Sequence, residues 1–175
     1  TAPINNIYGL HESLRIVLAA DPDGASAPDH WLRLAQLEAV HPGREAEAAE
    51  AARRALERSE APGLRREIRR VFEHCSAWSE AASLLRAETD ESAEPSPEAL
   101  RALARIEWDE LGRAAEADRA LEKLAACADL ELADRERWAA VRDALGDRMG
   151  AIEQRRRALD LARDSAGASR WLALS

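Results

Sequence analysis

Two stretches decide the fold of this chain: Gly112-Arg113-Ala114-Ala115-Glu116-Ala117 and Gly146-Asp147-Arg148-Met149-Gly150-Ala151. In both, an alanine follows a glycine by five residues, and the two alanines are 34 residues apart. Related stretches lead up to Ala48 and Ala81, so the successive steps between the four alanines are 33, 36 and 34 residues. A constant period of this length is the mark of a repeated structural unit.

Each unit has the pattern of two helices. Apolar residues recur at spacings of three and four, as at Leu14, Val17 and Leu18 or at Leu121 and Leu124, which is the spacing of one helical face. Glycine- and proline-containing stretches interrupt this pattern regularly, which excludes one long coiled coil. We therefore expect a helix over 7–20, helix pairs over 29–61, 62–95, 98–129 and 132–165, and a partial helix over 168–175.

The helix pairs resemble the tetratricopeptide repeat (TPR). The resemblance covers most of the chain and rests on small and apolar residues at matching positions: Ala48, Ala52 and Ala55-Leu56; Trp78, Ala81 and Leu85; Trp108, Gly112, Ala117, Leu121 and Leu124; Leu145-Gly146, Ala151 and Ala158-Leu159. Arginines stand where the first helix of the family has its usual aromatic residue: Arg65, Arg101 and Arg135. The resemblance implies an all-α, right-handed superhelical solenoid of about four antiparallel helix pairs, with a half pair at each end.

The resemblance also implies where a ligand would bind. In TPR proteins the first helices line a concave groove that receives peptide segments. The corresponding candidate binding residues are Arg33, Arg66, Arg70, Glu73, Asp109 and Arg137, with Glu136 and Asp143 nearby. Guanidinium groups are suited to carboxylates. The Lys and Asn pattern with which some family members hold a terminal carboxylate is absent, because Lys123 is the only lysine and lies on a second helix.

Composition excludes several classes of protein. The chain has 175 residues with a formal net charge of −8, which disfavours nucleic acid and anionic membranes as partners. No apolar stretch is long enough to span a membrane. One Phe and one Tyr argue against an all-β fold. The preference for arginine over lysine and the abundant alanine are typical of GC-rich coding, and we expect a bacterial, cytoplasmic protein.

No sequence motif supports chemistry. His11-Glu12 lacks the second histidine of the zinc-protease pattern, and His41 and His74 lack a third ligand, so we expect neither a metal nor a cofactor. Cys75 and Cys127 are predicted to be free thiols. Phosphate-binding and nucleophile motifs are absent. Trp78, Trp108 and Trp138 are expected to pack in the core, and Trp31 lies within one residue of a core position in the helix register.

Two functions fit this pattern. The first is a non-enzymatic scaffold module that binds a protein or peptide, as one part of a larger protein. The second is a regulatory or sensor domain that controls an attached catalytic or DNA-binding domain. Both ends of the repeat array look truncated, so self-association through the faces of Ile7 to Leu18 or Trp171 to Leu174 is also expected.

Overall fold

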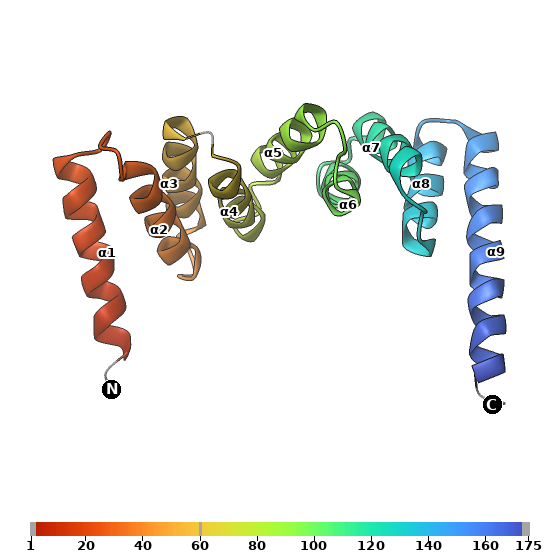
Figure 1. The fold of residues 1–175 in the computed structure, drawn as a ribbon, viewed down its shortest axis with the longest axis horizontal. Coiled ribbons are helices and arrows are strands. Elements are labelled where there is room, and N and C mark those ends of the chain that lie inside the picture. The colour runs from red at the N-terminus through yellow and green to blue at the C-terminus, as the bar shows by residue number, and fades with distance from the viewer. Residues whose placement is uncertain (1–2, 60, 173–175) are drawn as a thin grey trace. The chain divides into compact units, whose positions relative to one another are not determined.

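The computed structural model describes the backbone of residues 3–59 and 61–172 and the side chains of residues 9–59 and 61–163. Helices follow one another throughout these residues, with no strand among them (Figure 1). Their bounds are α1 Pro3–Ala20, α2 Ala27–Ala39, α3 Glu45–Arg58, α4 Pro62–His74, α5 Trp78–Glu91, α6 Pro97–Arg105, η1 Ile106–Glu110, α7 Ala114–Cys127, α8 Leu132–Ala144 and α9 Arg148–Leu172.

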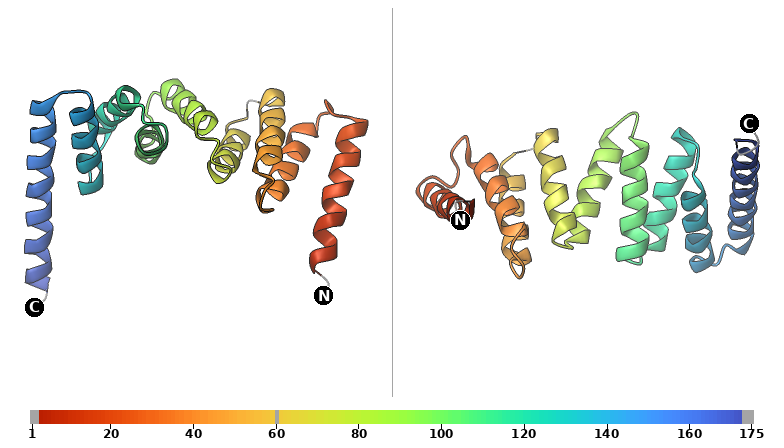
Figure 2. Two further views of the ribbon diagram at one scale, coloured as in Figure 1. Left: turned by 180° about the vertical axis from the view of Figure 1, so that it is seen from behind. Right: turned by 90° about the horizontal axis from the view of Figure 1, so that it is seen from below.

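The chain divides into two compact units, Thr1–Leu84 and Leu85–Ser175. In the first unit α2 packs against α1, α3 and α4, and α3 also packs against α4. In the second unit α7 packs against α6 and α8, and α8 packs against α9. Figure 2 shows the alternating direction of successive helices within each unit. This arrangement confirms the predicted all-α fold of repeated antiparallel helix pairs.

Four alanines anchor the second helix of each pair. Ala48, Ala81, Ala117 and Ala151, here called the anchor alanines, are each the fourth residue of their helix and are completely buried. The backbone N–H of each donates to the carbonyl oxygen four residues earlier, at 3.0 or 3.1 Å. Because alanine ends at Cβ, a neighbouring helix can lie against each of these positions. The sequence period is therefore a period of close helix packing.

The turn inside each pair has one backbone conformation. Five residues before each anchor alanine stands a residue with positive φ: Gly43 at 83°, Ser76 at 56°, Gly112 at 63° and Gly146 at 81°. Glycine adopts this left-handed conformation without a steric penalty, whereas a side chain at Ser76 must tolerate it. The turn therefore keeps the same left-handed backbone conformation in all four pairs, although the second pair has Ser76 where the others have glycine.

Three helices have a proline in their first turn. Pro28, Pro62 and Pro97 lie in the first turns of α2, α4 and α6, where a missing N–H leaves no helical hydrogen bond unmade. Ser96 caps α6, since its Oγ accepts a hydrogen bond from the N–H of Ala99 at 3.3 Å.

The first helix of the third pair ends in a π-helical turn, η1, which the sequence did not predict. The N–H of Leu111 donates to the carbonyl of Ile106 at 3.0 Å, five residues earlier. The nine residues of α6 and the five of η1 make this first helix one residue longer than the thirteen-residue helices α2, α4 and α8. A π turn absorbs one extra residue without ending the helix. Glu107 and Trp108 lie within it.

Two expected helix bounds are wrong. No separate helix begins at residue 168, because α9 continues from Arg148 to Leu172. The stretch contains no proline, and its two glycines, Gly150 and Gly167, each cost a long helix only about 1 kcal/mol. At the other end, α1 begins at Pro3 rather than at residue 7.

The tryptophans divide into two groups. Trp31 and Trp138 are buried, with 9% and 6% of their surface exposed, whereas Trp78 and Trp108 are half-buried. The side chains of Trp171 and Leu174 lie outside the described residues, so only the α1 part of the expected self-association faces is described, where Ile16 and Val17 are exposed. Cys75 and Cys127 are free thiols, as predicted, and burial raises the pKa of Cys75.

Candidate binding site

Three of the predicted binding residues lie on the first helices of the first unit. Arg33 is on α2, and Arg66 and Arg70 are one turn apart on α4, the helix that packs against α2. Arg33 and Arg66 are 33 residues apart, the same step as Ala48 to Ala81, so they hold the same position in consecutive pairs. We call the surface formed by Arg33, Gln36, Val40, Arg66, Arg70 and His74 the first-helix face.

The arginines of the first-helix face differ in whether they form ion pairs. Arg70 pairs with Glu67 at 2.7 Å. Arg33 donates to the side-chain oxygen of Gln36 at 3.5 Å, and neither Arg33 nor Arg66 forms an ion pair with any described residue. Both side chains are exposed. Two guanidinium groups at equivalent positions are therefore available to a ligand.

A shallow groove of about 250 Å³ runs along this face between α2 and α4. Its lining is formed by Gln36, Ala39, Val40, Glu67, Arg70, Val71 and His74. Val40 is 64% exposed, so this side chain presents apolar surface to the groove. An apolar strip beside guanidinium groups can contact both the stem and the charged end of an acidic side chain.

The other predicted residues are engaged in local ion pairs. Glu73 accepts a hydrogen bond from Arg69 on its own helix. In the second unit, Arg137 of α8 donates to Asp109 of η1 at 3.1 Å. Asp109 and Arg137 thus satisfy one another, and they link the first helices of the third and fourth pairs.

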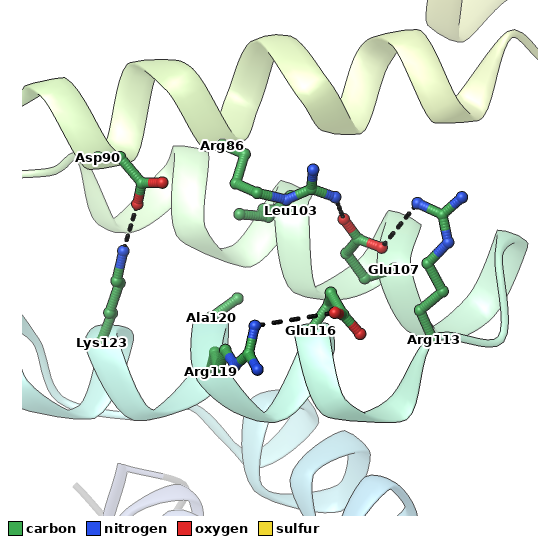
Figure 3. Close-up of a pocket in the computed structure, with 9 residues that line it drawn as sticks. All are labelled: Arg86, Asp90, Leu103, Glu107, Arg113, Glu116, Arg119, Ala120 and Lys123. Carbon is green, nitrogen blue, oxygen red and sulfur yellow. Dashed lines mark hydrogen bonds and ion pairs between the residues drawn. The ribbon is translucent and has the colours of Figure 1, made fainter.

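The most deeply buried charged residue of the second unit is Glu107, which is completely inaccessible to solvent. Its carboxylate lies between two guanidinium groups: Arg86 of α5 donates to Oε1, and Arg113 stands 3.7 Å from Oε2 (Figure 3). Burying an unpaired carboxylate would cost several kcal/mol, so two cations from different elements are needed to hold it there.

The first unit contains the same arrangement around Glu38, which is 1% exposed. Arg15 of α1 donates to Oε1 at 2.9 Å, Arg44 lies 2.8 Å from Oε2, and the His11 ring nitrogen is 2.6 Å from Oε1. Burial acts to raise the pKa of Glu38, but the hydrogen bonds from His11 and Arg15 and the charge of Arg44 outweigh it, so the pKa is lowered. Glu38 is therefore ionised at neutral pH.

Each buried glutamate lines a pocket, and the two pockets are repeats of one another. The Glu38 pocket is about 640 Å³ and the Glu107 pocket about 440 Å³. Six lining residues of the first correspond in position to six of the second at an offset of 69 residues: Leu34 and Leu103, Glu38 and Glu107, Glu47 and Glu116, Glu50 and Arg119, Ala51 and Ala120, Arg54 and Lys123. Both pockets are lined by residues of the second helix of a pair, and neither shares a lining residue with the first-helix face.

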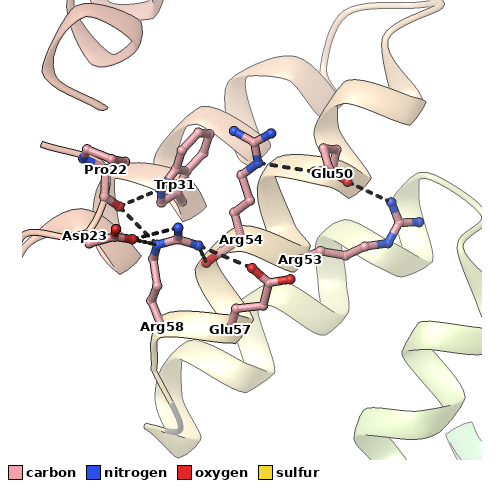
Figure 4. Close-up of polar contacts among 8 residues, drawn as sticks. All are labelled: Pro22, Asp23, Trp31, Glu50, Arg53, Arg54, Glu57 and Arg58. Carbon is pink, nitrogen blue, oxygen red and sulfur yellow. Dashed lines mark hydrogen bonds and ion pairs between the residues drawn. The ribbon is translucent and has the colours of Figure 1, made fainter. Parts of the chain in front are cut away.

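Arg54 lines the Glu38 pocket together with Pro22, Trp31 and Glu50, and Figure 4 shows the polar contacts of these residues with neighbouring arginines. The guanidinium of Arg54 stacks on the Trp31 ring at 4.8 Å. Arg58 donates to the Pro22 carbonyl at 3.0 Å and to Asp23 at 2.9 Å. These contacts tie the α1–α2 connection to α3 and fix the wall of the pocket.

The sequence analysis missed both buried glutamates, although a signal for them exists. Glu38 and Glu107 stand ten residues before an anchor alanine, where the other two pairs have Val71 and Val141. A carboxylate at a position that is otherwise apolar in the repeat indicates a buried charge with a partner.

The described residues contain no group of three or more His, Cys, Asp or Glu side chains that could hold a metal ion. Among the same residues, no helix combines the length and apolar character that crossing a bilayer requires. The chemistry that the site residues offer is the recognition of charge by paired and unpaired guanidinium groups.

Comparison with known proteins supports the fold. No protein-family model matches this sequence, and no curated protein is similar to it. Among solved structures, a MamA protein is similar with a TM-score of 0.63 at 16% identity, over 93% of this chain and 86% of that one. MamA from Desulfovibrio magneticus gives 0.58 at 15% identity, over 89% and 86%.

A further solved structure is a Podosopora anserina putative kinesin light chain with nearly identical TPR-like repeats. Its TM-score is 0.55 at 19% identity, over 93% of this chain and 89% of that one. Together these similarities confirm that the chain has a TPR-like helical-repeat fold.

Proposed function

We propose that this chain is a non-enzymatic module that binds a protein or peptide partner, and that its first-helix face receives an acidic segment of that partner. The observation that carries the proposal is the pair Arg33 and Arg66: two exposed guanidinium groups at equivalent positions of adjacent helices, without ion pairs among the described residues. The apolar strip of Ala39, Val40 and Val71 between the two helices supports it. We also keep the expectation of a bacterial, cytoplasmic setting.

Charge explains why such a face would be selective. The chain carries a net charge of −8, so an acidic ligand is repelled over most of the surface and is attracted only where cations are left unpaired. Each guanidinium can hold a carboxylate through two parallel N–H donors. Glu73, Asp109 and Arg137, which the TPR resemblance also implies, remain part of the proposal as ion-paired residues of the first helices.

The experiment is a quantitative pull-down from an extract of the source organism, using three forms of the chain. The double variant Arg33→Ala, Arg66→Ala should lose most of the captured partner while its thermal midpoint stays within about 2 °C of the wild type. The matched control is Arg148→Ala, Arg156→Ala, which removes two exposed arginines of α9. Equal capture by all three forms would contradict the proposal.

A further inference from the structure

We infer that the Glu107 pocket is a second binding site, separate from the first-helix face, and that it takes an acidic side chain of a partner polypeptide between Arg119 and Lys123. Every lining residue belongs to the second unit: Arg86 and Asp90 on α5, Leu103 and Glu107 on α6 and η1, and Arg113, Glu116, Arg119, Ala120 and Lys123 around α7. The inference does not depend on the first-helix face.

The interior of the pocket is formed by buried residues and by one buried ion-paired carboxylate. Glu107 is completely buried and is held by Arg86 and Arg113, while Leu103 and Ala120 are apolar lining residues beside it. This arrangement neutralises the buried carboxylate with cations from two sides, so that Glu107 does not by itself repel an incoming anion. The Oε2 atom of Glu107 accepts no hydrogen bond and lies 3.7 Å from the Arg113 guanidinium.

The charge of the pocket is opposite to that of the chain. Four cations and three carboxylates line it, so the net charge of the lining is +1, against −8 for the whole protein. Local positive charge in an acidic protein favours entry of an anionic group there.

Two of the four cations are free to move toward a ligand. The side chain of Arg119 is 73% exposed, and its ion pair with Glu116 at 3.8 Å is too long for a hydrogen bond. Lys123 is 47% exposed and pairs with Asp90, which is itself 55% exposed (Figure 3). Exposed pairs of this kind contribute little to stability and exchange partners readily. Asp90 therefore stands where a ligand carboxylate would bind.

The Glu38 pocket has the same design with the opposite charge. It has two cations, Arg15 and Arg54, and three carboxylates, Glu38, Glu47 and Glu50, so the net charge of its lining is −1. The position that reverses is Glu50, which corresponds to Arg119 at the offset of 69 residues. The Glu38 pocket is therefore a control within the same chain, because a lining with net negative charge should not bind an acidic ligand.

The test uses the single lysine of the chain as a reporter. Reductive methylation with ¹³C-formaldehyde labels Lys123 and keeps its positive charge, and its methyl resonance is followed during titration with an acetylated, amidated hexaglutamate peptide. We expect a saturable shift with this peptide and none with hexaglutamine. The titration is repeated in the Arg33→Ala, Arg66→Ala background, so that a failure of the first-helix face does not affect the result.

Two variants of the pocket test whether its ligand is an anion or a cation. Asp90→Asn should strengthen hexaglutamate binding by about threefold or more, because it removes the carboxylate that competes for Lys123. Arg119→Glu should weaken binding by a similar factor or abolish it. If the pocket instead takes cations, Asp90→Asn would leave the hexaglutamate affinity unchanged and would weaken binding of hexalysine, and the inference would be wrong.

A gain-of-function variant of the Glu38 pocket completes the test. Glu50→Arg gives that pocket the same net charge as the Glu107 pocket, so calorimetry in the double-alanine background should show a second hexaglutamate site. An absent Lys123 shift, or a shift that Arg119→Glu leaves unchanged, would overturn the inference. Circular dichroism of each variant verifies that the helices remain folded.

Discussion

Glu38 and Glu107 lie 69 residues apart and hold the same position in the first and third helix pairs, each buried between an arginine of the preceding helix and an arginine of the following turn. The second and fourth pairs have Val71 and Val141 there, both buried. A buried carboxylate is stable only where two arginines lie beside it, so it restricts which residues can surround it. A buried valine packs against any apolar surface. The protein therefore alternates between a charged and an apolar way of joining successive helices.

The first prediction concerns the stability contributed by Glu107. Glu107→Ala should lower the free energy of unfolding by about 2 kcal/mol, because it leaves a cavity and removes the partner of Arg86. Glu107→Val should cost about 1 kcal/mol or less, since valine fills the corresponding place in the other pairs and both arginines can turn toward water. Urea unfolding measures both values. The control is Glu110→Ala on the same π turn, and an equal loss from Glu110→Ala would refute the special role of Glu107.

The second prediction is a pH dependence that comes from Glu38. Its pKa is lowered in the folded protein from an ordinary value of 4.5. The stability that this carboxylate contributes is therefore complete above about pH 4.5 and is lost as the pH falls through the folded value. Charged groups around Glu38 are Arg15, Arg44 and His11.

Urea unfolding of the wild type and Glu38→Gln between pH 7 and pH 3 measures this effect. The wild type should be more stable than the variant at pH 7, and the difference should shrink below about pH 4.5. Because Glu45, Glu80 and Glu98 also have lowered pKa values, only the difference between the two proteins isolates Glu38. A difference that stays constant over this range would show that Glu38 does not titrate as described.

The third prediction tests the anchor alanines. Ala117→Leu adds three carbon atoms at a completely buried position, so we expect a loss of about 1 to 3 kcal/mol in unfolding free energy. Ala125→Leu on the same helix is the matched control, because Ala125 is exposed and leucine is nearly as good a helix former. Equal stability of the two variants would mean that close packing at Ala117 is not required.

The fourth prediction concerns the left-handed turn residues. Ser76→Gly should raise the unfolding free energy by up to about 1 kcal/mol, because φ is 56° there and glycine adopts this conformation without strain. The reverse change, Gly112→Ser, should lower it by about 1 kcal/mol, although a Cβ at Gly112 would meet no atom within 4 Å. Thermal midpoints rank the two variants, and a stabilising Gly112→Ser would contradict the reasoning.

Several features of the fold follow from the sequence because they depend on local rules. The anchor alanines and the glycines that precede them mark the turns, and the prolines mark helix starts. The same period placed Arg33 and Arg66 at equivalent positions. The turns and the helix starts are visible because each depends on residues within one or two helical turns of one another, whereas the equivalence of Arg33 and Arg66 is visible because the repeat period is nearly constant.

The tertiary structure alone decided which charges are buried and with what partners. Glu107 is paired with Arg86, 21 residues away on another helix, and nothing in the spacing of either residue requires that contact. The two matching pockets likewise depend on which side chains the packing of neighbouring helices brings together. Local sequence sets backbone conformation and apolar spacing, but the energy of a buried charge depends on groups that only folding brings within a few ångströms.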